Sequence, residues 1–269
     1  MLNTTVTLKN GVIMPVLGAG TWQIKNDEAY RVVKEALEAG YRLIDTANGY
    51  GNEEGVGRAI RESGIAREEI FVTSKLPAEI KGYDETMASF NSTMEKLGLD
   101  YLDLYLIHAP WPWEDMGGDY AEGNIASWKA MEELYNAGRI RAIGISNFQP
   151  NNIEPLLKNC TVVPHVNQIS YYVGHIQRAC TEYCLEKGIL VESYAPLATG
   201  AVFKQELVHT LAAKNNVTAA QLCIRYCLQK GRVTIPKSTH KERLIENANL
   251  SFVIPPEDIA ALDALDTEN

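Results

Sequence analysis

Four ionisable side chains lie at or just after the ends of short apolar segments of strand length. The four residues are Asp45, Tyr50, Lys75 and His108, and the segments are Leu43–Thr46, Phe71–Ser74 and Leu102–Ile107. Each residue alone has an ordinary structural explanation: a capping Asp, a packed Tyr, a solvated Lys or a loop His. If the segments are neighbouring parallel strands, however, their carboxyl ends meet at one place. Their shared position then favours a chemical role for the set.

The chemistry that suits this set is proton delivery to a carbonyl oxygen. A Tyr hydroxyl, with an unperturbed pKa of about 10, is a poor acid at neutral pH. We expect the Lys75 ammonium to favour the phenolate of Tyr50 and lower its pKa toward the working range. Asp45 would hold Lys75 as its ion-pair partner, and His108 would orient the substrate oxygen by a hydrogen bond.

The elements that must position these residues alternate between strand-length apolar runs and helix-length amphipathic stretches. The expected strands are Val16–Ala19, Leu43–Thr46, Phe71–Ser74, Leu102–Ile107, Ala142–Ile145, His165–Ile169, Leu190–Ser193 and Val233–Ile235. The expected helices are Asp27–Ala39, Glu53–Ser63, Tyr83–Leu97, Ile125–Ala137, Asn151–Lys158, Ile176–Glu186, Thr218–Gln229 and Lys241–Asn249. Before them, Thr5–Lys9 and Val12–Met14 flank Asn10-Gly11, the signal of a β-hairpin with a type I′ turn.

Eight strand–helix units without a Pro/Gly/Ser-rich linker predict an α/β fold. We expect one (β/α)8 TIM barrel with an N-terminal β-hairpin, forming a single domain over residues 1–269. The rival is an open doubly wound sheet, which normally carries G-x-G-x-x-G after its first strand when it binds a dinucleotide. Gly18-Ala-Gly20 has no third glycine. The HExxH, P-loop and GxSxG motifs are also absent, which argues against metalloprotease, NTPase and α/β-hydrolase functions.

Charge and composition exclude further classes of protein. The chain has 25 Lys+Arg and 34 Asp+Glu, a formal net charge of −9, and no long basic run, so neither nucleic acid nor an anionic membrane is an expected partner. No apolar stretch approaches the roughly 20 residues that span a bilayer. The start MLNTTVTLKN lacks signal-peptide features, which favours a cytoplasmic location. Cys180/Cys184 and Cys223/Cys227 have the wrong spacing for a zinc site, so we expect buried thiols and no metal.

The four residues and their surroundings resemble a known family. DTANGYGNEEGVGRAI, VTSKL and LYLIHAPWP are similar to the segments that carry the Asp-Tyr-Lys-His tetrad of the aldo-keto reductases, NAD(P)H-dependent carbonyl reductases on this barrel. The resemblance runs from about Val6 to Leu250 and is nearest to short microbial, 2,5-diketogluconate reductase-like members. It implies that Tyr50 is the general acid, that Lys75 lowers its pKa, that Asp45 pairs with Lys75, and that His108 orients the carbonyl.

The same resemblance implies an NADPH site. The residues matching the family's nicotinamide contacts are Ser146, Asn147 and Gln168 for the carboxamide, Tyr194 for stacking on the ring, and nearby Leu197. Those matching its adenosine contacts are Lys237, Ser238 and Arg243 for the 2′-phosphate, and Glu246 and Asn247 for the adenine. A capping Ser238 and free N–H groups at a helix start after the eighth strand would favour a phosphate independently of the resemblance. Two cations there favour NADPH over NADH.

A small carbonyl compound is the expected substrate, in an apolar pocket walled by Trp22, Tyr50 and Trp111 beside His108. Trp113 fits either lid packing or the surface. Ala109 stands where many relatives carry Trp, and Ala195 where Ser is common. The chain also ends soon after its last helical stretch, which implies an open site of the kind that accepts dicarbonyls, aldehydes and keto sugars.

Two alternative functions stay open at this point, and a monomer is the expected state. One is a non-catalytic NADP(H)-binding, redox-sensing subunit on the same fold. The other is a Schiff-base lyase that uses Lys75 as its nucleophile.

Overall fold

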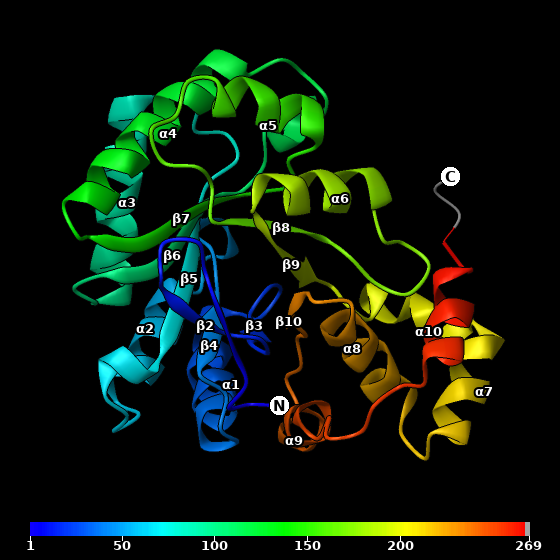
Figure 1. Ribbon diagram of the computed structural model, residues 1–269. Coiled ribbons are helices and arrows are strands. Elements are labelled where there is room, and N and C mark those ends of the chain that lie inside the picture. The colour runs from blue at the N-terminus through cyan, green and yellow to red at the C-terminus, as the bar shows by residue number, and fades with distance from the viewer. Residues whose placement is uncertain (267–269) are drawn as a thin grey trace.

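The computed structural model describes residues 1–266 and contains a barrel of eight parallel strands surrounded by helices (Figure 1). Neighbouring strands follow one another in sequence order from β3 to β10. The strands are β3 Ala19–Gly20, β4 Leu43–Asp45, β5 Phe71–Leu76, β6 Leu102–Ile107, β7 Ile140–Ser146, β8 Val166–Ser170, β9 Leu190–Tyr194 and β10 Val233–Ile235. The predicted α/β barrel is confirmed.

The barrel is closed by a short join between its first and last strands. Leu17 forms a parallel bridge with Thr234, and the Gly18 N–H donates to the Thr234 carbonyl at 2.9 Å. A Cβ on Gly18 would lie 2.5 Å from Leu43 Cγ, so only glycine lets the chain pass this close to β4. The predicted first strand, Val16–Ala19, was therefore misplaced: its residues form the bridge, and β3 itself is shorter and later.

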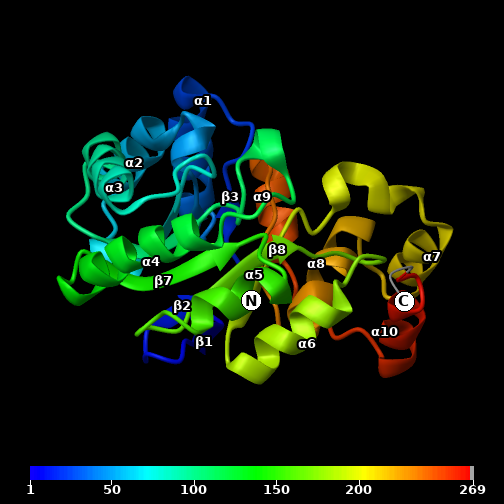
Figure 2. The same cartoon turned by 90° about the horizontal axis from the view of Figure 1, so that it is seen from above.

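Helices cover the outside of the barrel (Figure 2). They are α1 Asn26–Glu38, α2 Glu53–Arg61, α3 Tyr83–Leu97, α4 Ala121–Asn136, α5 Pro150–Leu157, α6 Arg178–Lys187, α7 Glu206–Lys214, α8 Ala219–Gln229, α9 Lys241–Ala248 and α10 Pro256–Asp263. Helix α4 begins four residues before the predicted Ile125. Gly123, a poor helix former, lies in its first turn, where a Cβ would approach Lys81 Cβ to 2.7 Å.

Helices α7 and α10 were missed in the sequence. Both are short additions to the eight strand–helix units, and they lie beside each other near the C-terminus (Figure 1). Helix α7 buries Val208, Leu211 and Ala212, while α10 begins at Pro256 and buries Leu262. Strand β9 is already followed by α8, the helix of its strand–helix unit. The eightfold strand–helix pattern therefore predicted neither α7 nor α10.

The hairpin consists of β1 Thr5–Thr7 and β2 Ile13–Pro15, with Val6 opposite Met14. Its predicted type I′ turn was wrong. Of the loop residues only Gly11 has a positive φ, and the Leu8 N–H donates to the Val12 carbonyl at 2.8 Å, which gives a three-residue loop. Leu8 and Met14 pack with the first residues of several strands inside the barrel, so the hairpin closes its amino end.

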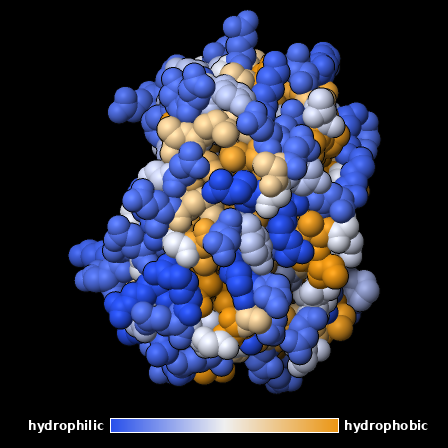
Figure 3. Space-filling model, turned by 90° about the vertical axis from the view of Figure 1, so that its left-hand side faces the viewer, coloured by the Kyte–Doolittle hydropathy of each residue, from blue (hydrophilic) through white to orange (hydrophobic). Residues whose placement is uncertain are grey.

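The core has two layers. Strand residues that face inward, including Leu43, Phe71 and Val166, fill the lower barrel with the hairpin side chains. Residues at the alternate positions, such as Ile44 and Val72, pack outward against the helices. Figure 3 shows one outer face, on which hydrophilic side chains dominate and apolar residues appear between them. Within residues 1–266 no helix is both long and apolar enough to cross a membrane.

Candidate active site

A buried ion pair lies at the carboxyl end of the barrel. Asp45 is the last residue of β4, and Lys75 lies near the end of the neighbouring β5. Lys75 Nζ donates to the two carboxylate oxygens of Asp45 at 2.7 and 2.8 Å, and both side chains are almost completely buried. An amine buried this deeply needs such a partner.

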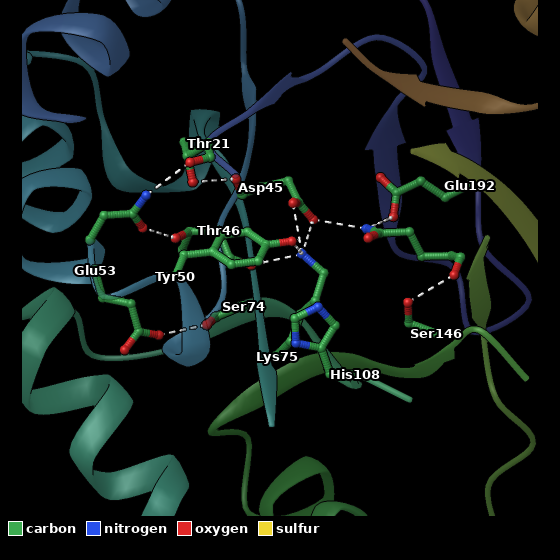
Figure 4. A network of polar contacts seen from close by, with 12 residues as sticks. Thr21, Asp45, Thr46, Tyr50, Glu53, Ser74, Lys75, His108, Ser146 and Glu192 are labelled. Atoms are coloured by element: carbon green, nitrogen blue, oxygen red, sulfur yellow. Dashed lines mark hydrogen bonds and ion pairs between the residues drawn. The ribbon is translucent and has the colours of Figure 1, made fainter. Parts of the chain in front are cut away.

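The Lys75 ammonium also contacts the third member of the predicted set. A short 3-10 turn after β4, Asn48–Tyr50, brings Tyr50 over Lys75, and the distance from Lys75 Nζ to Tyr50 Oη is 3.3 Å. A further hydrogen bond runs from Lys75 Nζ to the Thr46 carbonyl at 2.9 Å. Figure 4 shows the phenol and the carboxylate converging on this one nitrogen. The three N–H bonds of the ammonium thus have three different partners.

Burial and neighbouring charges act in opposite directions on the pKa of Lys75 and on that of Tyr50, with a different outcome for each. Burial alone lowers the pKa of Lys75, but the Asp45 carboxylate and the Tyr50 hydroxyl outweigh it, so the pKa is raised and the amine stays charged. Burial likewise raises the pKa of Tyr50, and the Lys75 ammonium only partly opposes this. The expected net lowering of the Tyr50 pKa was therefore wrong for the protein without cofactor, because the loss of water exceeds the attraction of the cation.

His108 follows β6 and lies beside Tyr50. The two ring centroids are 5.6 Å apart in an edge-on arrangement, and the Trp113 ring packs on the other side at 5.5 Å. Burial, with repulsion from Lys75 and Lys81, lowers the pKa of His108 to about 3. The imidazole is therefore neutral at physiological pH and offers one N–H donor.

Asn52 fixes the loops that carry these residues, and sequence reasoning missed it. Its side-chain amide donates to the Thr21 and Ile24 carbonyls, each at 2.9 Å, and its oxygen accepts from Thr46 Oγ1 at 2.6 Å. The loop after β3 is thereby tied to the loop that holds Tyr50. The one local signal was an Asn directly before helix α2, where a capping role is the usual explanation.

A cavity of about 990 Å³ opens above the four residues. Asp45, Tyr50 and His108 line it, together with Trp22 and Trp113, which are 49% and 43% exposed. Trp111 is not among the lining residues. Its ring packs against Trp113 at 5.5 Å, so Trp113 forms the wall that the sequence assigned to Trp111.

The residues assigned to the nicotinamide line the same cavity as Tyr50. Asn147, with a φ of +62°, donates from its amide to the His108 carbonyl at 2.9 Å and accepts from Tyr194 Oη at 2.8 Å. Ser146 Oγ donates to the Gln168 backbone carbonyl at 2.8 Å. These bonds hold an aromatic face and several amide groups at fixed positions, as recognition of a planar carboxamide requires.

A smaller cavity of about 270 Å³ lies at the start of α9, and Leu197, Lys237 and Arg243 line both cavities. Its other lining residues include the remaining residues assigned to the adenosine, Ser238, Glu246 and Asn247. The predicted helix-capping role of Ser238 was wrong: His240 occupies the N-cap position of α9 without a side-chain cap hydrogen bond, and Ser238 Oγ accepts from the His240 N–H at 3.1 Å in the turn before it. One groove thus joins a cationic end to the tetrad, which fits a dinucleotide phosphate.

A barrel with this tetrad at its mouth defines a class of carbonyl-reducing oxidoreductases, and comparison with known proteins agrees. Residues 16–267 match the aldo/keto reductase family, and the chain belongs to it. It is therefore an oxidoreductase of a family that uses NAD(P)H.

Individual relatives cover nearly the whole chain. The chain is 46% identical to the glyoxal reductase of Bacillus subtilis over 99% of this chain and 94% of the relative. A crystal structure of an aldo/keto reductase from Brucella melitensis superposes with a TM-score of 0.92 at 40% identity, covering 98% of each chain. An aldo-keto reductase of Bombyx mori in complex with NADP gives a TM-score of 0.90 at 33% identity, covering 99% of this chain and 94% of that one.

Proposed function

We propose that this chain, as a single barrel domain, reduces aldehydes or ketones to alcohols with NADPH, and that Tyr50 is the general acid. The observation that carries the proposal is the 3.3 Å approach of Lys75 Nζ to Tyr50 Oη at the wall of a cavity large enough for cofactor and substrate. The nicotinamide, when bound, supplies the hydride that the carbonyl carbon receives.

The chain supplies the proton. Because Tyr50 is uncharged at neutral pH, its hydroxyl is able to donate to the carbonyl oxygen as negative charge develops there. The phenolate left behind faces the Lys75 ammonium, which stabilises it. Neutral His108 is placed to donate a second hydrogen bond to the same oxygen, so the carbonyl is held between two donors.

Lys237 and Arg243 support the preference for NADPH. Both line the groove at its distal end, close to the start of α9, where an anion is also stabilised by the helix dipole. A 2′-phosphate is the charge that distinguishes NADPH from NADH. The Bombyx mori relative binds NADP, which agrees with this assignment.

The substrate is proposed to be a small carbonyl compound. Trp22 and Trp113 give the outer cavity apolar walls and leave it open, which suits short aldehydes and dicarbonyls. The relative named glyoxal reductase supports this class. We also propose that the protein works in the cytoplasm. We further propose that it is a monomer, because one chain supplies every residue assigned to the site; light scattering at assay concentration tests the oligomeric state.

Lys75 is poorly suited to Schiff-base chemistry. A nucleophilic amine must lose its proton, but the hydrogen bonds to Asp45, Thr46 and Tyr50 and the raised pKa keep Lys75 as an ammonium.

A steady-state assay separates the reductase from a redox-sensing subunit. Falling NADPH absorbance on addition of methylglyoxal or nitrobenzaldehyde is expected. Tight NADPH binding without turnover of either compound would favour the sensor instead.

A further inference from the structure

A second buried carboxyl lies near the tetrad, and the mechanism above does not use it. Glu192 is in β9, directly opposite Gln168 of β8, and its side chain is completely buried. Within residues 1–266, the hydrogen bond of Glu192 is to Gln168 and not to Lys75 or Tyr50. Its nearest polar partner is the side-chain amide of Gln168 (Figure 4).

The amide of Gln168 is held between two carboxyl groups. Gln168 Nε2 donates to Asp45 Oδ2 at 2.8 Å and to Glu192 Oε2 at 2.8 Å. An amide nitrogen carries two hydrogens, so both are used. The orientation of the Gln168 amide follows from the chemistry of Asp45. The Asp45 carboxylate, paired with Lys75, only accepts hydrogen bonds, so the NH2 group of Gln168 must face it. Only the amide oxygen of Gln168 remains for the cavity that this residue lines.

We propose that Glu192 is a positioning residue, which holds Gln168 so that its amide oxygen, and not its NH2 group, is presented to the carboxamide N–H of the cofactor. The inference rests on the proposed function, because it assumes that the cofactor's nicotinamide enters this cavity. Without Glu192, one Gln168 hydrogen would have no acceptor and the amide would be free to rotate away from Asp45.

Two features of Glu192 agree with a role directed at Gln168 alone. Its Oε1 atom is buried without a hydrogen-bond partner within residues 1–266, so Oε2 makes its one bond. Burial and repulsion by Asp45 raise the pKa of Glu192 to about 8, while Gln168 and Lys75 oppose the rise. The charged groups that act on it are Asp45 on β4 and Lys75 on β5; β8 contributes neutral Gln168, and β10 pairs through Val233.

The raised pKa favours the protonated, uncharged form of Glu192. It then accepts from Gln168 without placing a second negative charge beside Asp45. An uncharged Glu192 can therefore hold the Gln168 amide without electrostatic repulsion of Asp45.

The test compares two cofactors in binding, without turnover. Quenching of tryptophan fluorescence would give Kd for NADP+ and for its 3-acetylpyridine analogue, which keeps the ring carbonyl but has no carboxamide N–H. Glu192→Leu is expected to weaken NADP+ by about tenfold and the analogue by less than about twofold, because only the former loses a hydrogen bond. Glu192→Gln keeps an acceptor for Gln168 and should stay within about twofold of wild type for both.

Equal weakening of the two cofactors by Glu192→Leu, or no weakening of either, would overturn the proposal. If circular dichroism shows that this variant is unfolded, Glu192→Asp, which is one methylene too short to reach Gln168, is read by the same criteria. The outcome is separable from the proposed function: a protein that binds as expected but reduces no carbonyl would contradict the reductase assignment and leave the role of Glu192 intact.

Discussion

Lys75 Nζ lies 2.7 Å from Asp45 Oδ1 and 3.3 Å from Tyr50 Oη, so a single cation is shared by a carboxylate and a phenol. With Tyr50 protonated, the three groups carry no net charge. Once the proton has left, they carry one negative charge, distributed around a buried ammonium. The Lys75 ammonium therefore stabilises the phenolate more than the phenol, and this partly offsets the burial that raises the pKa of Tyr50.

Tyr50→Phe removes the proposed proton donor and keeps the ring that packs against His108. Turnover of methylglyoxal should fall by about 10²–10⁴-fold. NADPH affinity, measured by fluorescence quenching, should stay within a few-fold because no charge is lost. Wild-type turnover in this variant would show that another group donates the proton.

Lys75→Met leaves the Asp45 carboxylate buried without its cation. The free energy of unfolding in urea should drop by about 3–5 kcal/mol. The double variant Asp45→Asn/Lys75→Met removes both charges and should recover part of the loss. A double variant no more stable than Lys75→Met would mean that the unpaired charge is not the cause.

Lys237→Ala and Arg243→Ala should each raise the Kd of NADPH by about tenfold or more, because each removes a proposed charge-assisted contact to the 2′-phosphate. The Kd of NADH should change by about twofold or less. Lys241→Ala is the matched control, since Lys241 is a nearby cation that pairs with Glu38 on the surface. Equal losses for both cofactors would remove the assignment of the phosphate site.

Trp113→Ala should raise KM for nitrobenzaldehyde more than for methylglyoxal, because the larger substrate reaches further toward the apolar wall. The rate constant at saturation should change little. Trp111→Ala, which removes a ring behind that wall, should have the smaller effect. A larger rise in KM with Trp111→Ala would instead indicate that Trp111 lines the substrate pocket.

Glu192 gives the stability a predictable dependence on pH. Its pKa is about 8 in the folded protein and about 4.5 when unfolded, so the folded state binds the proton more tightly. Stability is greatest below the unfolded value and falls as pH rises toward 8. Urea midpoints of wild type should therefore decline relative to those of Glu192→Gln between about pH 5 and 8, and the difference should level off above it. A constant difference across this range would contradict the raised pKa.

The sequence could predict strands and tetrad because both signals are local. Apolar runs located β4, β5 and β6, and ionisable residues at their ends located Asp45, Lys75 and His108. The predicted turn type of the hairpin was wrong because Asn10-Gly11 is compatible with more than one loop length. Only the long-range geometry distinguishes them.

The sequence could not predict the residues that hold the site residues in position. Asn52 and Glu192 act through partners in other elements, and Gln168 reaches an Asp45 that is 123 positions away. The predicted direction of the Tyr50 pKa shift was wrong for a related reason. The neighbouring cation was predictable from the sequence, but the extent of burial that outweighs its effect was not.

The hairpin side chains Leu8 and Met14 fill the amino end of the barrel, and the cavity that Tyr50 lines lies at the opposite, carboxyl end. If Tyr50 is the general acid, as proposed, the proton that it gives up is replaced from the same cavity in which the alcohol product forms. On this proposal the reprotonation of Tyr50 depends on release of the product, so slow release would delay both steps.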